Sequence, residues 1–553
     1  MGAYRRPGQE RGSRGRSDVS VAELTVVIDV FIGRVSLLAI LILGGVFASV
    51  AAGADVLDSD TGRRMYREGI RPSGEPLTAI VAGDVPVLGT QFSCQNCHGR
   101  SGMGSAEGTY IVPAIAGPLL YAPSPQPERP AYDPVSLARV LRDGVTPAGR
   151  QLNPLMPRYV LSDAEVSDLA VYLAGLSASA SPGVDDKQIR LATVMTDDVS
   201  PDVRAAVLAV LQTFVDDKNR QTRLESQRHD RGSTPESRLP TLHRDWQLDV
   251  WTLKGPAESW GEQLDTYYKE APVFAMLSGV STGSWGPIGH FCERNEIPCL
   301  FPGTDLPDAG ESDFYTQYFS RGLNLEADLI ANHLSEQPPG SVVQVFCDAV
   351  PARAAAALRS KLEPGGISVD DLEFDCDAAL PVAALSERLA EGATAVLWVR
   401  HEQLTDLTQP LPAGRVYLSS TLLNRQLDEL LPSVPGPLFV VHPFRLPGKT
   451  DPAFMRFTIW ARSRDVEIRY PRLQSEAFFA CIATNDALIH LQRYLVRDYV
   501  LDMLDHAQGL SAFVPIYPRP TLGPDQRFLT KGGYVLPVLN GQPDSTSAVW
   551  IQP

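Results

Sequence analysis

The sequence lacks an excess of basic residues. Its 553 residues include 49 lysines and arginines against 65 aspartates and glutamates, a formal net charge of -16. Broad binding to nucleic acid or to an anionic membrane needs a basic face, so both are excluded as general roles of the chain. The sequence also contains no HExxH or Walker motif, which leaves the corresponding zinc-protease and nucleotide-binding chemistries without a site.

The length of the chain requires more than one domain. Single hydrophobic cores stop growing at about 250–300 residues, so we expect two or three domains. The composition, 44% hydrophobic and 21% charged, is that of a globular protein. After a leader, three zones can be distinguished by composition: residues 55–178, a linker of small and polar residues at 179–188, and residues 189–553.

The N-terminus carries an uncharged apolar block. Residues 35–54 are VSLLAILILGGVFASVAAGA, preceded by Arg34 and ended by small residues. We interpret residues 1–54 as a signal peptide cleaved near Ala54 or Ala51, or as a retained membrane anchor, because about 20 apolar residues also span a bilayer. Either alternative places the remaining chain in the periplasm, soluble or anchored to the inner membrane, where disulfides can form.

Two helices are marked by their ends in the first zone. DPVSLARVLRDG has Asp133 at the N-cap, a proline at the first helical position and Gly144 just after the end. SDAEVSDLAVYLAGL has a capping box, Ser162 with Glu165, and apolar residues at helical spacing. Because no comparable strand pattern is evident, we predict that this zone is a small all-α domain.

The stretch CQNCH holds Cys94, Cys97 and His98 within five residues. A structural zinc site needs a second pair of ligands, and a thioredoxin-like dithiol needs a preceding strand; neither is found nearby. The spacing is that of a c-type haem attachment site. We therefore predict one covalent haem c, with thioethers from the two cysteines and His98 on the iron. A single such motif argues against a multihaem protein.

Met156 is the predicted sixth ligand of the iron. It lies in NPLMPRY, where two prolines stiffen an extended loop before the capped final helix. Its alternative role is that of a gap-filling core residue. Of the competing methionines, Met103 is too close in sequence to His98 to reach the opposite haem face, and Met65 lies in the predicted first helix. His/Met ligation raises the reduction potential and blocks small molecules from the iron, as suits an electron carrier.

Four segments in order resemble a class I monohaem cytochrome c: TGRRMYREG, CQNCHG, LRDGVTPAGRQLNPLMPRY and LSDAEVSDLAVYLAGL. The resemblance extends from the first predicted helix of residues 55–178 to the last. It implies covalent attachment of haem at Cys94 and Cys97, axial ligation of the haem iron by His98 and Met156, and one-electron transfer as the function.

Beyond residue 188 the sequence alternates strand-like and helix-like segments. Apolar runs such as IRLATVM, APVFAMLSG, SVVQVFC and TAVLWV are separated by amphipathic stretches. This order predicts βαβ units, with parallel sheets covered by helices on both faces. Residues 189–553 are too many for one lobe, so we expect two.

Three segments of this zone resemble the type I periplasmic binding proteins of the branched-chain amino-acid class: APVFAMLSGVSTGSWGPIGHFCERNEIPCLFPGTDLPD, DFYTQYFSRGLNLEADLIANHL and YPRPTLGPDQRFLTKGGYVLPV. The resemblance implies two α/β lobes joined by a hinge, which close on a small ligand. By matching position it implies ligand contacts at the carboxyl ends of strands, from Ser281, Thr282, Ser284, Gly303 and Thr304.

Some residues depart from that family's pattern. Asp305 falls where a second hydroxyl is usual, and its charge would repel a ligand carboxylate. No acidic partner for a ligand ammonium is evident in the second lobe, where His442 and Arg445 are found instead. The hydroxyl cluster also has an alternative explanation in ordinary turn chemistry. Asp197 and Asp198 follow the first strand, and we expect them to cap the next helix.

Four further cysteines suit an oxidising compartment. Sequence alone does not fix their connectivity, so the pairs are hypotheses. Position along the predicted elements suggests two disulfides, Cys292 with Cys299 and Cys347 with Cys376.

The favoured function is a periplasmic c-type cytochrome, an electron carrier and not an enzyme. Its fused module would bind a small molecule or dock a dehydrogenase or other redox protein. The alternative is a ligand-binding or sensing protein of the ABC-transporter substrate-binding type, with an accessory haem. A third hypothesis, a catalytic haem enzyme, requires an open iron site.

Overall fold

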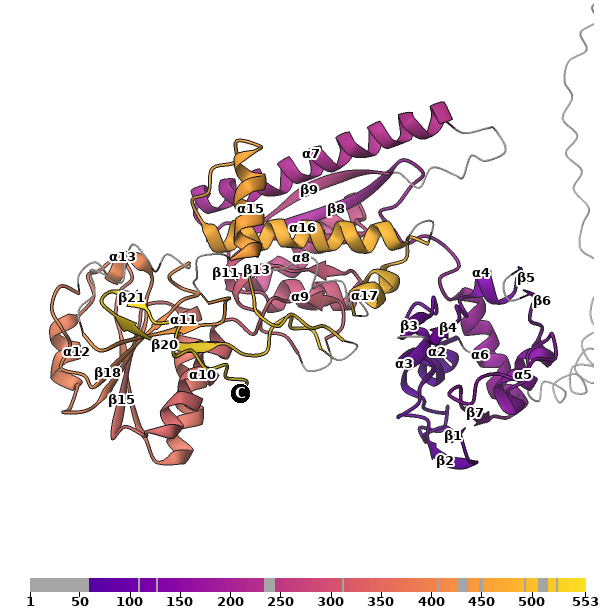
Figure 1. The fold of residues 1–553 in the computed structure, drawn as a ribbon, viewed down its shortest axis with the longest axis horizontal. Coiled ribbons are helices and arrows are strands. Elements are labelled where there is room, and N and C mark those ends of the chain that lie inside the picture. Colours follow the sequence, from indigo (N-terminus) through magenta and orange to yellow (C-terminus); the bar gives the residue numbers. More distant parts are fainter. Residues whose placement is uncertain are drawn as a thin grey trace, which may run out of the picture. The chain divides into compact units, whose positions relative to one another are not determined.

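The computed structural model describes the chain from residue 59 onward (Figure 1). The described range excludes the side chains of residues 106–107, 125 and 225–232 and all of residues 108–109, 126–127, 233–243, 311–312, 405–406, 425–426, 428–435, 447–450, 492–493, 506–515 and 524–525. The leader, residues 1–54, lies outside this range, so its interpretation as a signal peptide or an anchor stays a prediction. Within the described part, no helix is both long enough and apolar enough to cross a membrane.

The N-terminal domain, described over residues 59–178, has its core between helices. The two capped helices begin as predicted: Asp133 and Ser136 form a reciprocal capping box, as do Ser162 and Glu165. Gly144 ends the first of them with a φ of 70°, the left-handed conformation that glycine adopts readily. The helices are α2 (Ser59–Glu68), α3 (Cys94–His98), α4 (Gly117–Leu120), α5 (Pro134–Asp143) and α6 (Asp163–Gly175).

The first and last helices of this domain cross at close range. A Cβ atom on Gly62 of α2 would lie 2.3 Å from the carbonyl oxygen of Asp168 and 2.7 Å from the Cβ of Tyr172 in α6. Only glycine fits this position without a shift of backbone. One turn further along α2, the ring of Tyr66 packs against that of Tyr172, with centroids 5.4 Å apart.

Short strands supplement the helices of the N-terminal domain. An antiparallel sheet has the order β2-β1-β7, and two small hairpins pair β3 with β4 and β5 with β6. None of these strands exceeds four residues, and β2 is exposed along most of its length, so the sequence offers no alternating pattern to reveal them. Their bounds are Thr78–Val81 (β1), Val85–Leu88 (β2), Ser105–Glu107 (β3), Tyr110–Val112 (β4), Ser124–Pro125 (β5), Glu128–Arg129 (β6) and Arg158–Val160 (β7).

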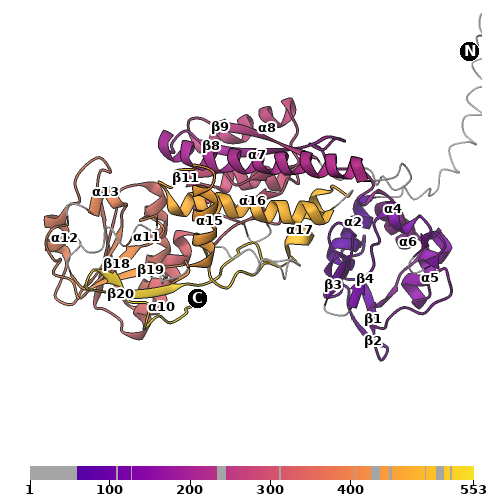
Figure 2. The ribbon, with the colours of Figure 1, turned by 45° about the horizontal axis from the view of Figure 1, so that its top comes forward.

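The rest of the chain, here called the two-lobed domain, contains two separate sheets (Figure 2). The first lobe has a parallel sheet of order β13-β11-β8-β10-β12-β14, with β9 also paired to β8. Its strands are β8 (Gln188–Thr196), β9 (Asp245–Leu253), β10 (Ala275–Leu277), β11 (Val280–Ser284), β12 (Cys299–Leu300), β13 (Gly303–Leu306) and β14 (Thr316–Gln317). The short helix η1 (Ala257–Ser259) precedes α8.

Alternate residues of the first-lobe strands face opposite cores. In β8, Leu191 and Met195 belong to a cluster with α7, α15 and α16, whereas Ala192 and Val194 belong to one with α8 and α9. Burial on both faces explains the near-continuous apolar runs in the sequence. The helices are α7 (Pro201–Gly232), α8 (Trp260–Glu270), α9 (Gly286–Arg294), α15 (Pro452–Arg462), α16 (Pro471–Leu491) and α17 (Arg497–Asp505).

The second lobe repeats this three-layer arrangement. Its sheet has the order β16-β15-β17-β18-β19-β20-β21, parallel up to β19 and antiparallel beyond it. One face packs on α10 and α11, and the other on α12 and α13. The elements are α10 (Leu323–Glu336), β15 (Ser341–Phe346), α11 (Ala349–Leu362), η2 (Glu363–Gly365), β16 (Ser368–Glu373), α12 (Val382–Arg388), β17 (Thr394–Trp398), α13 (His401–Leu404), β18 (Arg415–Ser419), β19 (Leu438–His442), β20 (Tyr534–Leu539) and β21 (Gln542–Pro543).

The described chain passes between the lobes three times. It enters the second lobe after β14, returns to the first after β19 to form α15, α16 and α17, and contributes β20 to the second sheet near its C-terminus. Several parallel connections of this kind are what a hinge between two lobes requires.

One predicted cysteine pair is bonded and the other is not. Cys347 and Cys376 form a disulfide just beyond the ends of the paired strands β15 and β16. Cys292 and Cys299 are both buried free thiols, so their predicted disulfide is wrong for this structure. The sulfur of Cys292 instead lies 3.5 Å from the sulfur of Met276, within the apolar core of the first lobe.

Removing the disulfide should destabilise the second lobe. Cys347 and Cys376 are separated by 29 residues, and closing a loop of that size in the unfolded chain corresponds to about 3.5 kcal/mol in the chain-entropy treatment. We expect the double variant Cys347→Ser/Cys376→Ser to have a lower melting temperature by calorimetry. Treating the wild-type protein with dithiothreitol should lower its melting temperature as much and leave the variant unchanged. A variant that melts with the untreated wild type would contradict the expectation.

Candidate haem site and ligand cleft

The CQNCH segment forms the short helix α3, which presents two thiols one turn apart. Cys94 is half-buried and packs against the apolar cluster of the N-terminal domain, whereas Cys97 is exposed. Neither cysteine is in a disulfide. Thioether formation requires that neither sulfur be in a disulfide, and both cysteines meet this condition, one near the core and one at the surface.

The hydrogen bond of His98 defines the tautomer of its neutral ring. Its side chain is buried, and Nδ1 lies 2.9 Å from the carbonyl oxygen of Pro113. A carbonyl can only accept a hydrogen bond, so Nδ1 carries the proton and Nε2 keeps its lone pair. Burial lowers the pKa of His98, and the bond to Pro113 opposes this in part. Such a second contact is what fixes the orientation of a metal-binding histidine.

Met156 lies on the same apolar cluster as Cys94. It is half-buried, which suits a thioether with room to bind a metal, whereas Met65 is fully buried in the core of the domain. Nearby, the hydroxyl of Tyr159 donates to the carbonyl oxygen of Phe92 at 2.7 Å and ties the Met156 loop to the segment before α3. The residues present fit haem c, and the assignment of Met156 as axial ligand stays a prediction.

The five predicted ligand-binding residues are brought together by two neighbouring strands. In the register of β11 and β13, Val280 lies beside Gly303 and Ser281 beside Thr304. Thr282 and Ser284 continue β11 at the same end of the sheet. The site predicted by resemblance is therefore contiguous in space.

Three of these hydroxyls stabilise their own loops. The hydroxyl oxygens of Ser281, Ser284 and Thr304 each accept the backbone N–H two residues ahead, at 3.1–3.2 Å. This is the turn chemistry that the sequence left open as an alternative. Gly279 to Gly283 also has the GxSxG spacing of a nucleophile elbow, but Ser281 lies within strand β11, and no histidine is among the contacts described for its hydroxyl.

Asp198 contacts one of the predicted ligand residues, Thr282, and does not cap α7. Its carboxylate accepts hydrogen bonds from the hydroxyls of Thr196 and, at 2.6 Å, Thr282. The hydroxyl of Ser200 accepts from the N–H of Val203 and begins α7 instead. The predicted capping role of Asp197 and Asp198 is wrong, because a serine nearer the helix takes it.

Asp305 is held between two guanidinium groups. Arg472 in α16 donates to its Oδ1 at 2.6 Å, and Arg400, from the second lobe, lies 3.4 Å from its Oδ2. All but a small part of the Asp305 side chain is buried. The charge that we expected to repel a ligand carboxylate is therefore offset by two cations.

A second ion pair also joins the lobes. Asp308, just after β13, forms two hydrogen bonds with Arg353 of α11, at 2.6 and 2.7 Å, and accepts a third from the hydroxyl of Ser284. The arginine and the serine lower the pKa of Asp308, with Arg353 the larger contribution. Two arginines of the second lobe thus reach acids of the first beside the predicted ligand residues.

Two more carboxyl groups are buried near Asp305. Glu476 in α16 accepts from the hydroxyl of Tyr517 at 2.6 Å and lies 3.5 Å from Arg472. Burial raises the pKa of Glu476, and Arg472 opposes the shift. Glu326 in α10 accepts from the N–H and hydroxyl of Thr421, at 3.1 and 2.7 Å.

His442 is unsuited to the role of a ligand contact. Its Nδ1 lies 2.9 Å from the hydroxyl of Ser420, and its Nε2 lies 2.9 Å from the carbonyl oxygen of Arg445. With both ring nitrogens engaged and the side chain buried, His442 stabilises the end of β19. The position considered for an ammonium partner is thus structural.

Sequence patterns did not reveal the charged residues that lie beside the predicted ligand residues. They are the acids Asp308, Glu326 and Glu476 and the bases Arg353, Arg400 and Arg472. One signal was available: Arg472 and Glu476 lie one turn apart in an otherwise apolar helix, where ionised groups need partners. Their partners come from segments far away in sequence, so their identity was not deducible.

Comparisons with known proteins divide the chain in the same way. Residues 89–177 match the cytochrome c family. No curated protein matches the chain. Among solved structures, a branched chain amino acid ABC transporter from Thermus thermophilus with bound valine is similar at a TM-score of 0.51 and 11% identity, over 67% of this chain and 98% of that one. A leucine binding protein from Thermotoga maritima gives 0.46 and 12%, over 66% and 99%. The chain thus joins a cytochrome c domain to an α/β domain that resembles type I periplasmic binding proteins.

Glu326 should make the stability of the second lobe depend on pH. Burial raises its pKa to about 7, although hydrogen bonds from Ser419 and Thr421 oppose the shift. The folded state then favours the protonated form, so its contribution is present below the unfolded pKa of about 4.5 and is lost as pH rises to about 7, by roughly 3 kcal/mol. Glu326→Gln should remove this slope in urea unfolding. Equal pH profiles for variant and wild type would contradict the assignment; near pH 4 the two should be equally stable.

Proposed function

We propose that this protein is a periplasmic c-type cytochrome that transfers single electrons. Its fused two-lobed domain would bind a small molecule or dock the redox partner, such as a dehydrogenase. The carrying observation is the set of donors in the N-terminal domain. The buried side chain of His98 donates its Nδ1–H to Pro113, and a half-buried thiol and thioether, Cys94 and Met156, share one apolar cluster.

Each residue of this set has a separate role in the proposal. Cys94 and Cys97 would hold one haem c covalently, and His98 and Met156 would be the axial ligands of its iron. Bound haem would supply an iron that accepts and releases one electron. A protein that commits both axial positions to its own side chains excludes peroxide and oxygen from the iron, which favours electron transfer over catalysis.

The alternative proposal is a ligand-binding or sensing protein with an accessory haem. It is favoured by the fold of the two-lobed domain and by the adjacency of Ser281 and Thr304 at the ends of β11 and β13. The ion pairs of Asp305 and Asp308 weigh against a ligand of the amino-acid type, because they occupy the predicted site with charges of both signs.

Replacing the proposed sixth ligand, Met156, should leave one coordination position of the haem iron accessible to small molecules. In Met156→Ala we expect the reduced protein to bind carbon monoxide, the methionine-to-iron absorption band of the oxidised protein to disappear, and the reduction potential to fall, because a thioether stabilises ferrous iron. Met103→Ala is the matched control and should retain the wild-type spectrum. The assignment fails if Met156→Ala keeps the wild-type spectrum and excludes carbon monoxide.

Valine is the probe for the alternative, because the similar structure from Thermus thermophilus contains bound valine. We expect no saturable rise of the melting temperature with valine, since the hydroxyls of Thr282 and Ser284 already donate to Asp198 and Asp308. A bound ligand would raise stability by RT ln(1 + [L]/Kd). A saturable rise that Thr304→Val abolishes would instead establish the cleft as an amino-acid site.

A further inference from the structure

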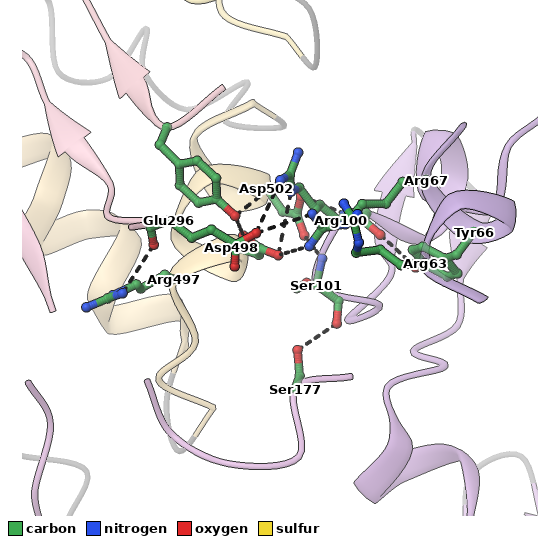
Figure 3. A network of polar contacts seen from close by, with 12 residues as sticks. Arg63, Tyr66, Arg67, Arg100, Ser101, Ser177, Glu296, Arg497, Asp498 and Asp502 are labelled. Atoms are coloured by element: carbon green, nitrogen blue, oxygen red, sulfur yellow. Dashed lines mark hydrogen bonds and ion pairs between the residues drawn. The ribbon is translucent and has the colours of Figure 1, made fainter. Parts of the chain in front are cut away.

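The loop that follows the predicted haem ligand is bonded to the two-lobed domain (Figure 3). Asp502 in α17 accepts the backbone N–H of Arg100 through Oδ1 at 3.0 Å and that of Ser101 through Oδ2 at 2.9 Å. Both amides lie within three residues of His98. A carboxylate that accepts two backbone N–H groups fixes the loop in position as well as orientation.

Gly99 makes this approach possible. Its φ is 75°, and a Cβ at this position would lie 2.6 Å from Oδ2 of Asp502, inside van der Waals contact. On the other side, the hydroxyl of Tyr66 donates to the carbonyl oxygen of Gly99 at 2.7 Å. The residue next to His98 is thus held between α2 of its own domain and α17 of the other.

The side chain of Arg100 makes cation–aromatic contacts with the two-lobed domain. Its guanidinium carbon lies 4.1 Å from the ring centroid of Phe314 and 5.0 Å from that of Tyr315. The same group is 3.7 Å from Asp498, which lies one turn before Asp502 in α17. A guanidinium over an aromatic ring is attracted by the negative face of the ring, most strongly where solvent is excluded.

Asp498 also forms an ion pair with a second arginine of the N-terminal domain, Arg67. Arg67 in α2 lies 3.2 Å from Oδ2 of Asp498, and the hydroxyl of Tyr315 donates to its Oδ1 at 2.7 Å. Arg67 and Asp498 expose only 10% and 13% of their side chains, so solvent screens this pair less than a surface pair.

Helix α17 is itself fixed to the first lobe. The buried guanidinium of Arg497 donates to the carbonyl oxygens of Phe274 at 3.0 Å and Val273 at 2.6 Å, just before β10. The predicted linker is fixed as well: Ser181 accepts from the N–H of Arg497 at 3.0 Å and donates its own N–H to Leu495. The carboxylates on α17 therefore occupy defined positions.

Asp502 carries its charge in a buried place. Its side chain is largely removed from solvent, and burial raises its pKa to about 6, although the N–H groups of Ser101 and Arg100 oppose the shift. At neutral pH the group is mainly a carboxylate. In the N-terminal domain it accepts hydrogen bonds from the N–H groups of Arg100 and Ser101, so an anion lies beside the backbone of the segment that follows His98.

We propose that Asp502 is a positioning residue for the haem: the two-lobed domain uses it to fix residues 99–101, to orient His98 and to place a negative charge next to the haem-binding segment. The inference rests on the proposed function, since it needs His98 on the haem iron. It assigns the two-lobed domain a role in setting the reduction potential, whatever its cleft binds.

The test is Asp502→Asn in the full-length, haem-loaded protein. Asparagine keeps the size of the side chain but presents an NH2 group to one of the two amides and carries no charge. We expect the reduction potential to become more positive, because the ferric state has one more positive charge than the ferrous state and loses a stabilising anion. We also expect the methionine-to-iron band to weaken as His98 loses its fixed orientation.

Asp505→Asn is the matched control. Asp505 lies in the same helix, equally buried, and pairs with Arg527 of its own domain at 2.8 Å. This variant should destabilise the two-lobed domain and leave the haem spectrum and potential as in the wild type. The proposal is overturned if Asp502→Asn keeps the wild-type potential and spectrum, or if Asp505→Asn shifts them as much.

Two further observations keep the test decisive. If Asp502→Asn does not fold, hydrogen exchange on the wild-type protein replaces it: slow exchange of the Arg100 and Ser101 amides supports the proposal, and fast exchange overturns it. A wild-type protein without low-spin haem c bands would reject the proposed function itself, a result distinct from a haem-loaded wild type whose Asp502 variant behaves normally.

Discussion

The hydrogen bond between His98 and Pro113 is the constraint on which the proposed chemistry depends. The single proton of a neutral imidazole can lie on either ring nitrogen, and a ring that carries it on Nε2 cannot bind iron through that atom. The carbonyl oxygen removes this freedom by demanding a proton on Nδ1. Everything else in the N-terminal domain supports that geometry: the close crossing of α2 and α6 at Gly62, the bond from Tyr66 to Gly99, and the shared cluster of Cys94 and Met156.

In the two-lobed domain, the fold resembles that of binding proteins, but residues beside the predicted ligand site form ion pairs with the opposite lobe. The positions that resemble a ligand site lie together, yet Asp305 and Asp308 bind Arg400 and Arg353 of the opposite lobe. These ion pairs join the two lobes through the chain's own side chains, and any ligand at the predicted site must compete with them. The structure therefore separates the fold, which is shared with amino-acid binding proteins, from ligand recognition, which the fold does not determine.

Local sequence patterns were enough to predict the fold. The candidate site was predicted less completely, because it depends on contacts between segments that are distant in sequence. The helix caps at Asp133 and Ser162 involve residues three positions further along the chain, so the starts of these helices could be predicted from the sequence. The CQNCH motif, with the cysteines and histidine proposed to bind haem, was evident for the same reason. The partners of Asp305 and Asp502 come from positions more than 90 residues distant, where no periodicity applies. Cys292 and Cys299 are close in sequence but form no disulfide in the apolar core, so closeness in sequence was not a sufficient basis for predicting one.

Ser181, in the segment that connects the two domains, is hydrogen-bonded to Leu495 and Arg497. Because the connection between them is covalent and short, the contacts of Asp502 with Arg100 and Ser101 form within one molecule. The effective concentration of one domain near the other is then on the order of millimolar, independent of how dilute the protein is. Association of two separate proteins through such contacts would depend on their concentrations, whereas here each segment that follows His98 has its own copy of α17.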